Sequence, residues 1–211
     1  MRQFILQQNI ARFRNGLAEA PDEARRRQIQ RLLTEAEGEL ALYEATQTGV
    51  GSHALLGANP TKVAESRGRM IDWFRREFAE GGRSAALIDP DPGLVFVEVT
   101  PPYEHLTGLT RDQLVGQQLF QLFPDNPDDP AANGVSVFYA SLRTVARTGQ
   151  PDALQVLRYD VRGDNGRFAE RYWHTTSSPL RDDEGRLIFL LLVVEEVTGE
   201  VLGASRRRAP G

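Results

Sequence analysis

The sequence predicts an α+β fold in which a helical hairpin and one further helix precede a domain built on an antiparallel β-sheet. Apolar residues recur at helical spacing through residues 1–48 and again around Met70. From Ser84 the pattern changes to short β-rich runs separated by reverse-turn sequences. Two early strands, a run of short helices and three consecutive late strands favour a mostly antiparallel sheet.

The bulk composition is ordinary for a globular protein, with 40% hydrophobic and 26% charged residues in a chain of 211. The formal net charge of -4 gives no electrostatic reason to expect nucleic acid or an anionic membrane as a partner. The longest apolar run, Leu187 to Val194, is too short to cross a bilayer, and the first residues lack a signal-peptide pattern. We therefore expect a cytoplasmic protein that does not bind membranes.

Residues 1–48 are expected to form the helical hairpin and to serve dimerisation. Their apolar positions are Leu6, Ile10, Phe13 and Leu17 in the first helix and Ile29, Leu33 and Leu40 in the second. Each helix therefore has one apolar stripe. A core made of two such stripes buries little apolar surface, so it poorly offsets the conformational entropy lost when the chain is ordered. We therefore expect two copies to close a four-helix bundle, which makes the protein a homodimer.

Residues 49–61 are small, contain glycine and carry almost no charge, so we expect a linker. Asn59 and Pro60 suit the cap and the first position of a helix, and we assign this N-terminal cap helix to residues 62–82. The apolar positions of this helix are Met70, Ile71, Phe74 and Phe78.

Five β-rich runs are expected to form the sheet. They are SAALID at 84–89, LVFVEV at 94–99, LQVLRYDV at 154–161, ERYWHTTS at 170–177 and LIFLLLVV at 187–194. The last run does not alternate, so both faces of that strand are expected to be buried. We expect the cap helix to cover its outer residues, Leu191 and Val193, and to lie between the sheet and the hairpin bundle.

The loop LFPDNPDDP combines acids and prolines before an apolar helix. Asp125 and Asp129 match two positions of a calcium-binding loop, but Pro127 occupies a ligand position and Ser136 stands where that loop needs a glutamate. Each proline also holds the preceding residue extended. We therefore expect a stiff corner without a metal, which turns the chain into the helix that begins near Val135.

The sequence contains no motif that points to catalysis. Gly49 to Ala54 match a dinucleotide glycine pattern, but a helix precedes them where that motif requires a strand. His53, His105 and His174 each lack a second histidine three or four positions away, so no local metal pair is expected. The absence of cysteine excludes disulfides, thiolate metal sites and cysteine nucleophiles. We expect no enzyme activity, and a small enzyme is the least favoured alternative.

The region from Ser84 to Thr198 resembles a PAS domain. The resemblance rests on IDPDPGLVFVEV leading into TGLTRDQLVG, on the FPDNPDDP corner and on the closing EEVTGE. It is most similar to sensory modules of bacterial histidine kinases and related signalling proteins. The resemblance implies a PAS domain at 83–199, followed by a C-terminal tail at 200–211. It also implies a five-stranded antiparallel sheet, a cavity between sheet and helices, and signalling that depends on a ligand or partner.

Strand parity and the positions used by ligand-binding members of that family imply a set of cavity residues. They are Phe138, Tyr139, Leu157, Tyr159, Trp173, Thr175, Ser177, Leu190, Leu192 and Val194. The same residues equally fit a core that encloses no ligand. Glu196 and Thr198 are implied as the link to a signal output. The identity of any cofactor stays open. The chain lacks the cysteine of light-sensing flavin domains. The expected helix around Ser136 to Ala146, which would form a wall of the cavity, lacks the histidine usual in haem-binding members.

These features together predict a cytoplasmic, non-enzymatic PAS sensor that dimerises through its N-terminal helices and senses a small ligand or binds a partner protein. A histidine kinase or a response regulator is a possible signalling partner. The alternative is a ligand-free interaction module whose core is filled by its own side chains.

Overall fold

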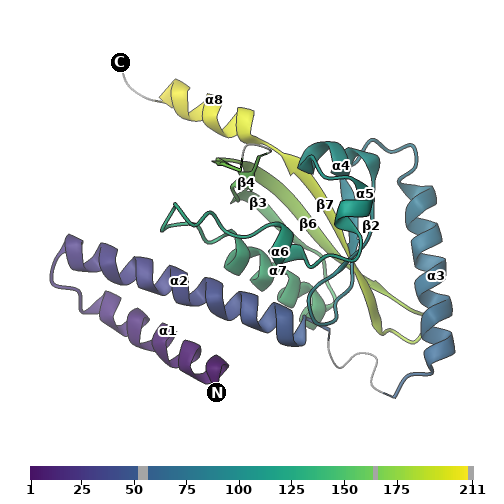
Figure 1. Cartoon of the computed structure of the whole chain (residues 1–211), viewed down its shortest axis with the longest axis horizontal. Coiled ribbons are helices and arrows are strands. Elements are labelled where there is room, and N and C mark those ends of the chain that lie inside the picture. Colours follow the sequence, from purple (N-terminus) through teal and green to yellow (C-terminus); the bar gives the residue numbers. More distant parts are fainter. Residues whose placement is uncertain (52–56, 164–165, 209–211) are drawn as a thin grey trace.

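The computed structural model describes residues 1–51, 57–163 and 166–208. Its centre is a five-stranded antiparallel sheet with the strand order β2-β1-β7-β6-β3 (Figure 1). The strands are β1 (Ala85–Ile88), β2 (Phe96–Val99), β3 (Asp152–Arg158), β6 (Tyr172–Arg181) and β7 (Leu187–Glu196). The predicted α+β class and the five-stranded sheet are therefore confirmed. The long strand β7 lies at the middle of the sheet, paired with β1 and β6.

The β-rich run at 154–161 does not form one strand. The chain leaves the sheet at Arg158, and β4 (Val161–Arg162) pairs with β5 (Phe168–Ala169) as a separate two-stranded hairpin. The Gly-bearing turn sequence between them joins strands that are too short to extend into the main sheet.

Four helices cover the inner face of the sheet. They are α4 (Pro101–Thr107), α5 (Arg111–Leu114), α6 (Leu119–Leu122) and α7 (Gly134–Thr148). The main core lies between these helices and the inward side chains of the strands. Its fully buried members include Ile88, Leu114, Leu142, Val145 and Leu190. This inner layer is where the resemblance places a cavity.

The outer face of the sheet is covered by α3 (Pro60–Glu77). Asn59 caps this helix, because its side-chain oxygen accepts a hydrogen bond from the Thr61 amide at 2.9 Å. Phe74 and Phe78 stack with ring centroids 4.9 Å apart and pack against the outer side of the sheet. Their partners are Ala85, Leu87, Ile188 and Phe189, with Leu191 and Val193 packed alongside. Both faces of β7 are therefore buried, as the unbroken apolar run predicts.

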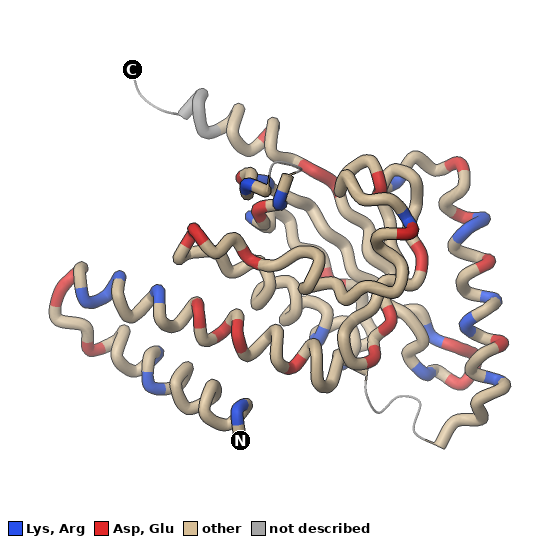
Figure 2. The backbone as a smooth tube through the Cα atoms, viewed as in Figure 1, with Lys and Arg blue, Asp and Glu red and all other residues tan. Residues whose placement is uncertain are grey.

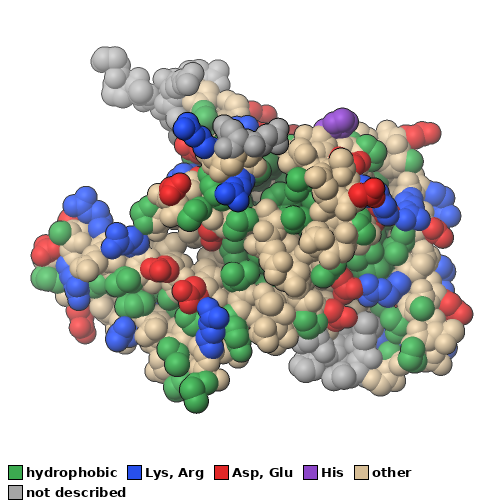
Figure 3. Space-filling view, in the orientation of Figure 1, with side chains coloured by type: hydrophobic (Ala, Val, Ile, Leu, Met, Phe, Trp, Pro, Cys, Tyr) green, Lys and Arg blue, Asp and Glu red, His purple; other side chains and the backbone are tan. Residues whose placement is uncertain are grey.

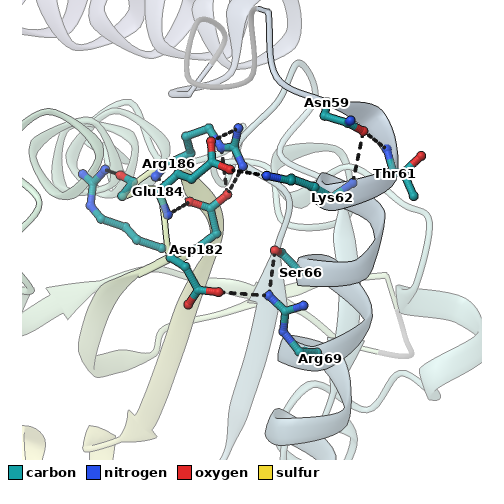
Figure 4. A network of polar contacts seen from close by, with 11 residues as sticks. Asn59, Thr61, Lys62, Ser66, Arg69, Asp182, Glu184 and Arg186 are labelled. Atoms are coloured by element: carbon teal, nitrogen blue, oxygen red, sulfur yellow. Dashed lines mark hydrogen bonds and ion pairs between the residues drawn. The ribbon is translucent and has the colours of Figure 1, made fainter.

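Polar contacts also join the start of α3 to the turn between β6 and β7 (Figure 4). Lys62 lies 3.6 Å from the Glu184 carboxylate, and Arg69 lies 3.4 Å from that of Asp183. These pairs are exposed, so each contributes little to stability. The apolar packing of the two phenylalanines holds α3 against the sheet, together with ion pairs from Arg67 to Asp89 and from Arg75 to the buried Glu98.

The N-terminal hairpin consists of α1 (Arg2–Ala18) and α2 (Glu23–Thr48). Its predicted stripes face each other within one chain, where Phe13, Leu17 and Leu40 pack against a cluster of more deeply buried residues. The most buried members of the stripes are Leu6, Ile10, Ile29 and Leu33, at 6 to 7% exposure. The stripes therefore do not need a second copy to be covered, contrary to the expectation from two thin helices.

The hairpin packs on the helical side of the domain, against α7, and α3 lies on the opposite side of the sheet (Figure 1). The expectation that the cap helix lies between sheet and hairpin is therefore wrong. Ala41 and Ala45 on α2 belong to the main core, and their small side chains allow the helix to approach α7 closely. Since α2 covers part of this core, the hairpin is structurally continuous with the sheet domain.

The described part of the C-terminal segment, as far as residue 208, is helical. Helix α8 (Thr198–Arg208) continues directly from β7 and projects away from the sheet (Figure 1).

In the part of the chain that the structure describes, no helix is long and apolar enough to cross a membrane. Along α2, arginines lie in the first half, and all of the glutamates except Glu23 lie from Glu35 onward (Figure 2). On the face shown in Figure 3, charges of both signs are interspersed.

Candidate functional site

A cavity of about 70 Å³ lies between the inner face of the sheet and the covering helices. Seven of the ten predicted residues line it, and they are Phe138, Leu157, Tyr159, Trp173, Thr175, Leu192 and Val194. Ser177 and Leu190 are fully buried in the inner layer but do not line the cavity. Tyr139 is buried on another side of α7, where it faces the hairpin.

The strands account for most of the predicted lining, whereas the short helices, Phe123 directly after α6 and Val161 on β4 supply residues that were not predicted. These residues are Tyr103, Leu106, Thr107, Leu119, Phe123 and Val161. A spacing of three or four residues within Tyr103 to Thr107 and between Leu119 and Phe123 is the signal that marks an inward helical face. The lining is therefore almost entirely apolar.

One wall of the cavity is fixed by Tyr159 and Trp173. The Trp173 indole donates a hydrogen bond to the Tyr159 carbonyl at 2.7 Å, and the Tyr159 hydroxyl donates to the Phe123 carbonyl. Burial raises the pKa of Tyr159, so its hydroxyl keeps the donated proton at neutral pH. Gly134 allows this ring to lie against the start of α7, because a Cβ there would be 2.4 Å from a Tyr159 ring carbon.

The polar feature of the cavity is Thr175. Its side chain is 6% exposed and lies in the wall, on the inner face of β6. Its hydroxyl has no hydrogen-bond partner among the described residues, and neither has that of Ser177, two positions further along the strand. Buried hydroxyls are nearly always paired, by protein, water or ligand. The Thr175 hydroxyl is therefore a buried hydrogen-bonding group without a partner in the described part of the chain, in a residue that lines a mostly apolar space.

The acidic loop between α6 and α7 is a structural corner. The Asp125 carboxylate accepts a hydrogen bond from the Val135 amide at 3.0 Å and so caps the first turn of α7. Burial raises the pKa of Asp125, although the amides of α7 oppose this shift. Arg158 lies 2.8 Å from Asp129 and 3.3 Å from Asp160, and so ties the loop to the end of β3.

The helix α7 has a second contact face, which meets the hairpin. The Tyr139 hydroxyl donates to the Gly49 carbonyl at 3.0 Å, directly after the last residue of α2. Burial raises the pKa of Tyr139 to about 12, and the nearby Glu44 adds to the shift. Arg143 lies 2.8 Å from Glu44, a carboxylate that also accepts a hydrogen bond from Gln3 on α1 at 3.0 Å.

The predicted output residues lie at the junction between β7 and α8. The Thr198 hydroxyl accepts a hydrogen bond from the Tyr172 amide at 3.0 Å, and Glu196 lies 3.3 Å from Arg171. Trp173, which follows Tyr172, is paired with Glu196 across the sheet. The first residue of α8 is therefore tied to the strand that carries the cavity wall.

The histidines do not assemble into a site in the described residues. His105 is exposed on α4 and His174 is half-buried on β6, while His53 lies outside the described residues. Within the ranges that the structure describes, no group of three or more histidines and carboxylates is placed to hold a metal ion. Among the described residues, several of the predicted site residues come together at the cavity.

Comparison with known proteins gives a family for the sheet domain. Residues 83–202, more than half of the chain, match the family model described as PAS fold. Similar solved structures include a light-oxygen-voltage domain studied with a flavin analogue (18% identity, 66% of this chain and 92% of that chain, TM-score 0.47). Another is the PAS domain of a protein from Colwellia psychrerythraea (14% identity, 62% and 98%, TM-score 0.46).

A third is the PAS domain of nitrogen regulation protein NR(II) from Vibrio parahaemolyticus (18% identity, 58% of this chain and 95% of that chain, TM-score 0.43). A search of curated proteins gave no match. The assignment therefore rests on the family model, which covers the whole sheet, the cavity and the start of α8. The chain belongs to the PAS fold family.

Proposed function

We propose that this protein, whose family serves in sensing and signal transduction, detects a small and mainly apolar ligand that carries one hydrogen-bonding group. The unpaired Thr175 hydroxyl in the wall of the apolar cavity carries this proposal. An occupant that bonds to it would remove the cost of an unsatisfied buried hydroxyl, which is about 1–3 kcal/mol. Apolar contacts with Leu192 and Val194 would supply the remaining affinity.

The size of the cavity limits the ligand. A volume of about 70 Å³ holds a few water molecules, since each needs about 10–15 Å³ of such space. Pockets for drug-sized ligands measure about 300–1,000 Å³. A ligand of a few non-hydrogen atoms therefore fits between the walls as they stand. A flavin or a haem does not fit unless the walls move apart.

The small volume also favours a second candidate function, a protein-interaction module with a filled core. In that case a water molecule would occupy the cavity and bond to Thr175. Neither candidate requires catalysis, and we propose that the domain is not an enzyme. The two candidates differ in whether purified protein carries, or can take up, an organic ligand.

We further propose that the protein acts in the cytoplasm as a homodimer, with a different contact from the one expected. The predicted stripes are covered within one chain, whereas Phe4 and Ile5 on α1 are 64% and 51% exposed and Leu42 on α2 is 42% exposed. Exposed apolar residues grouped on one hairpin suit contact with a second copy. A signalling partner, such as a histidine kinase or a response regulator, would act at the α8 end of the domain.

Native mass spectrometry tests the ligand and the oligomer together. The comparison is between the folded mass and the mass after denaturation, for the natural chain and for Thr175→Val. We expect a small extra mass in the folded natural chain, released on denaturation and reduced in Thr175→Val. Identical folded and denatured masses, together with a loss of stability in Thr175→Val, would show that the hydroxyl already has its partner and would support the filled-core module.

A further inference from the structure

Helix α7 separates two spaces in the molecule. Phe138 lines the cavity against the sheet, while Tyr139 and Arg143 face the groove beneath the hairpin. Consecutive residues on an α-helix point about 100° apart, so Phe138 and Tyr139 necessarily face different neighbours. A displacement of the helix at either residue is therefore felt at the other.

Besides the packing of Ala41 and Ala45 in the main core, two sets of polar contacts hold the hairpin to the domain. The first set is to α7, through Tyr139 to the Gly49 carbonyl and Arg143 to Glu44. The second set is to the turn between β1 and β2. The Val50 and Gly51 amides donate to the Pro90 carbonyl at 2.8 and 3.0 Å. Only the first set moves with α7, because the second joins the end of α2 to the sheet.

The second set has the properties of a pivot. Gly49 has a positive φ of 60°, and a Cβ there would lie 2.3 Å from the Pro90 carbonyl oxygen. The Gly93 amide also donates to the Ala45 carbonyl at 2.8 Å. The C-terminal end of α2 is therefore fixed against the sheet, while its other end extends away from the domain (Figure 1).

The length of α2 turns a small tilt into a large displacement. The helix has 26 residues, so at 1.5 Å per residue it is about 39 Å long. Ala41 lies about 12 Å from the pivot at Gly49, and Arg26 lies about 35 Å from it. Each ångström of movement at Ala41 becomes about 3 Å at Arg26. A groove of about 1040 Å³ between α1, α2 and α7 leaves space for such a tilt.

We propose that α7 couples the size of the cavity occupant to the angle of the N-terminal hairpin. This inference rests on the proposed sensing function. An occupant that overfills the space of about 70 Å³ presses on the walls that line it. The strand walls are held by the sheet hydrogen bonds, so the wall that yields is the helical one that carries Phe138. Movement of α7 then acts on α2 through its packing with Ala41 and through Arg143 to Glu44, both of which lie N-terminal to the pivot at Gly49.

The coupling predicts a reciprocal effect. If a large occupant favours the tilted hairpin, then releasing the hairpin from α7 must favour a large occupant by the same factor. A ligand that fits the existing space has no such effect, because it displaces nothing. The signal therefore depends on ligand size, and its output is the position of the hairpin.

Distance measurement between two spin labels tests the coupling directly. The chain has no cysteine, so Arg26→Cys and Gln155→Cys label the free end of α2 and the exposed edge strand β3 without interference. Thr175→Phe overfills the cavity, and Thr176→Phe is the matched control, because Thr176 is exposed on the outer face of the same strand. We expect Thr175→Phe to shift the label distance by about 3 Å or more and Thr176→Phe to leave it unchanged. A folded Thr175→Phe protein with an unshifted distance would overturn the coupling.

A second measurement applies even if Thr175→Phe fails to fold. The double variant Tyr139→Phe with Arg143→Ala releases α7 from the hairpin, and Arg147→Ala is the control, an arginine on the same helix with no ion pair among the described residues. Cyclohexanol serves as the large probe and propan-1-ol as the small one, both followed by methyl NMR. We expect the double variant to bind cyclohexanol several-fold more tightly than the natural chain, with propan-1-ol unaffected.

Equal cyclohexanol affinities in the double variant, the control and the natural chain would contradict the coupling. Failure of both probes to bind any of these proteins would instead contradict the proposed ligand cavity. The label-distance result does not depend on a ligand, so the two failures are distinguishable.

Discussion

Replacing Trp173 with alanine tests the orientation of the whole inner layer. The indole is 7% exposed, lines the cavity and donates a hydrogen bond to the Tyr159 carbonyl at 2.7 Å. This substitution removes core packing, a cavity wall and one hydrogen bond at once. If the ring faced solvent, the substitution would have little effect.

The expected cost follows from these contacts. Truncating a buried aromatic side chain to alanine costs about 3–5 kcal/mol. The lost hydrogen bond adds about 1 kcal/mol. Since a cavity of about 70 Å³ already borders the ring, the new space joins it and the site collapses poorly. We therefore expect a loss of about 5 kcal/mol in the free energy of unfolding.

The other tryptophan is a matched control. Trp73 is 37% exposed on α3 and makes one edge contact with Phe78, with ring centroids 6.2 Å apart. Trp73→Ala should cost only about 1 kcal/mol. Urea unfolding followed by circular dichroism measures both variants without relying on tryptophan fluorescence. Trp173→Phe, which keeps most of the packing, serves if Trp173→Ala does not fold.

Enlargement of the cavity gives this prediction a second readout. An apolar cavity of about 150 Å³ binds benzene, so Trp173→Ala should also bind benzene and gain stability from it. Equal losses for Trp173→Ala and Trp73→Ala, without benzene binding, would refute the assigned orientation of β6.

Three further predictions concern other parts of the fold. Gly134→Ala should lower the unfolding midpoint in urea, because its Cβ would meet the Tyr159 ring at 2.4 Å, and an unchanged midpoint would contradict this packing. Burial disfavours the charged form of Glu98, but hydrogen bonds from Arg111 and Arg75 outweigh it and lower the pKa of Glu98. Its folded pKa therefore lies below the unfolded value, so the stability it contributes is present at neutral pH and lost as the pH falls through the folded pKa. Stability of the natural chain should fall more on acidification than that of Glu98→Gln, and parallel pH profiles would contradict this. Deleting residues 1–48 should cost more than about 2 kcal/mol, because it uncovers large core side chains, and an equally stable truncated domain would contradict the continuity of hairpin and core.

The sequence predicted the sheet well because its strands are marked by local signals. The unbroken apolar run of β7 indicated burial on both faces, and the structure covers one face with α3 and the other with the main core. Strand parity likewise placed Trp173 and Thr175 inward, since alternate residues of a strand share a face. Burial of both faces and the choice of inward residues are properties of a single strand, and the pattern of apolar residues along that strand indicates them directly.

Contacts between distant elements were less predictable. The apolar stripes of α1 and α2 indicated that something covers them, but not that each helix covers the other within one chain. Ala41 and Ala45 carried no strong apolar signal, although they place α2 against α7. Similarly, the short helices around Tyr103 and Leu119 line the cavity, although the inward spacing of their residues extends over little more than one turn.

The hydrogen bond that Thr175 offers to a ligand is the central claim, and one NMR titration tests it most directly. Xenon and propan-1-ol are titrated into the natural chain and into Thr175→Val, with the methyl signals of Leu192 and Val194 as reporters. Xenon needs no hydrogen bond, so we expect it to bind both proteins equally. Propan-1-ol should bind the natural chain about 5-fold more tightly, which corresponds to about 1 kcal/mol for one hydrogen bond. Equal propan-1-ol affinities, or no change of these signals with either probe, would contradict the account.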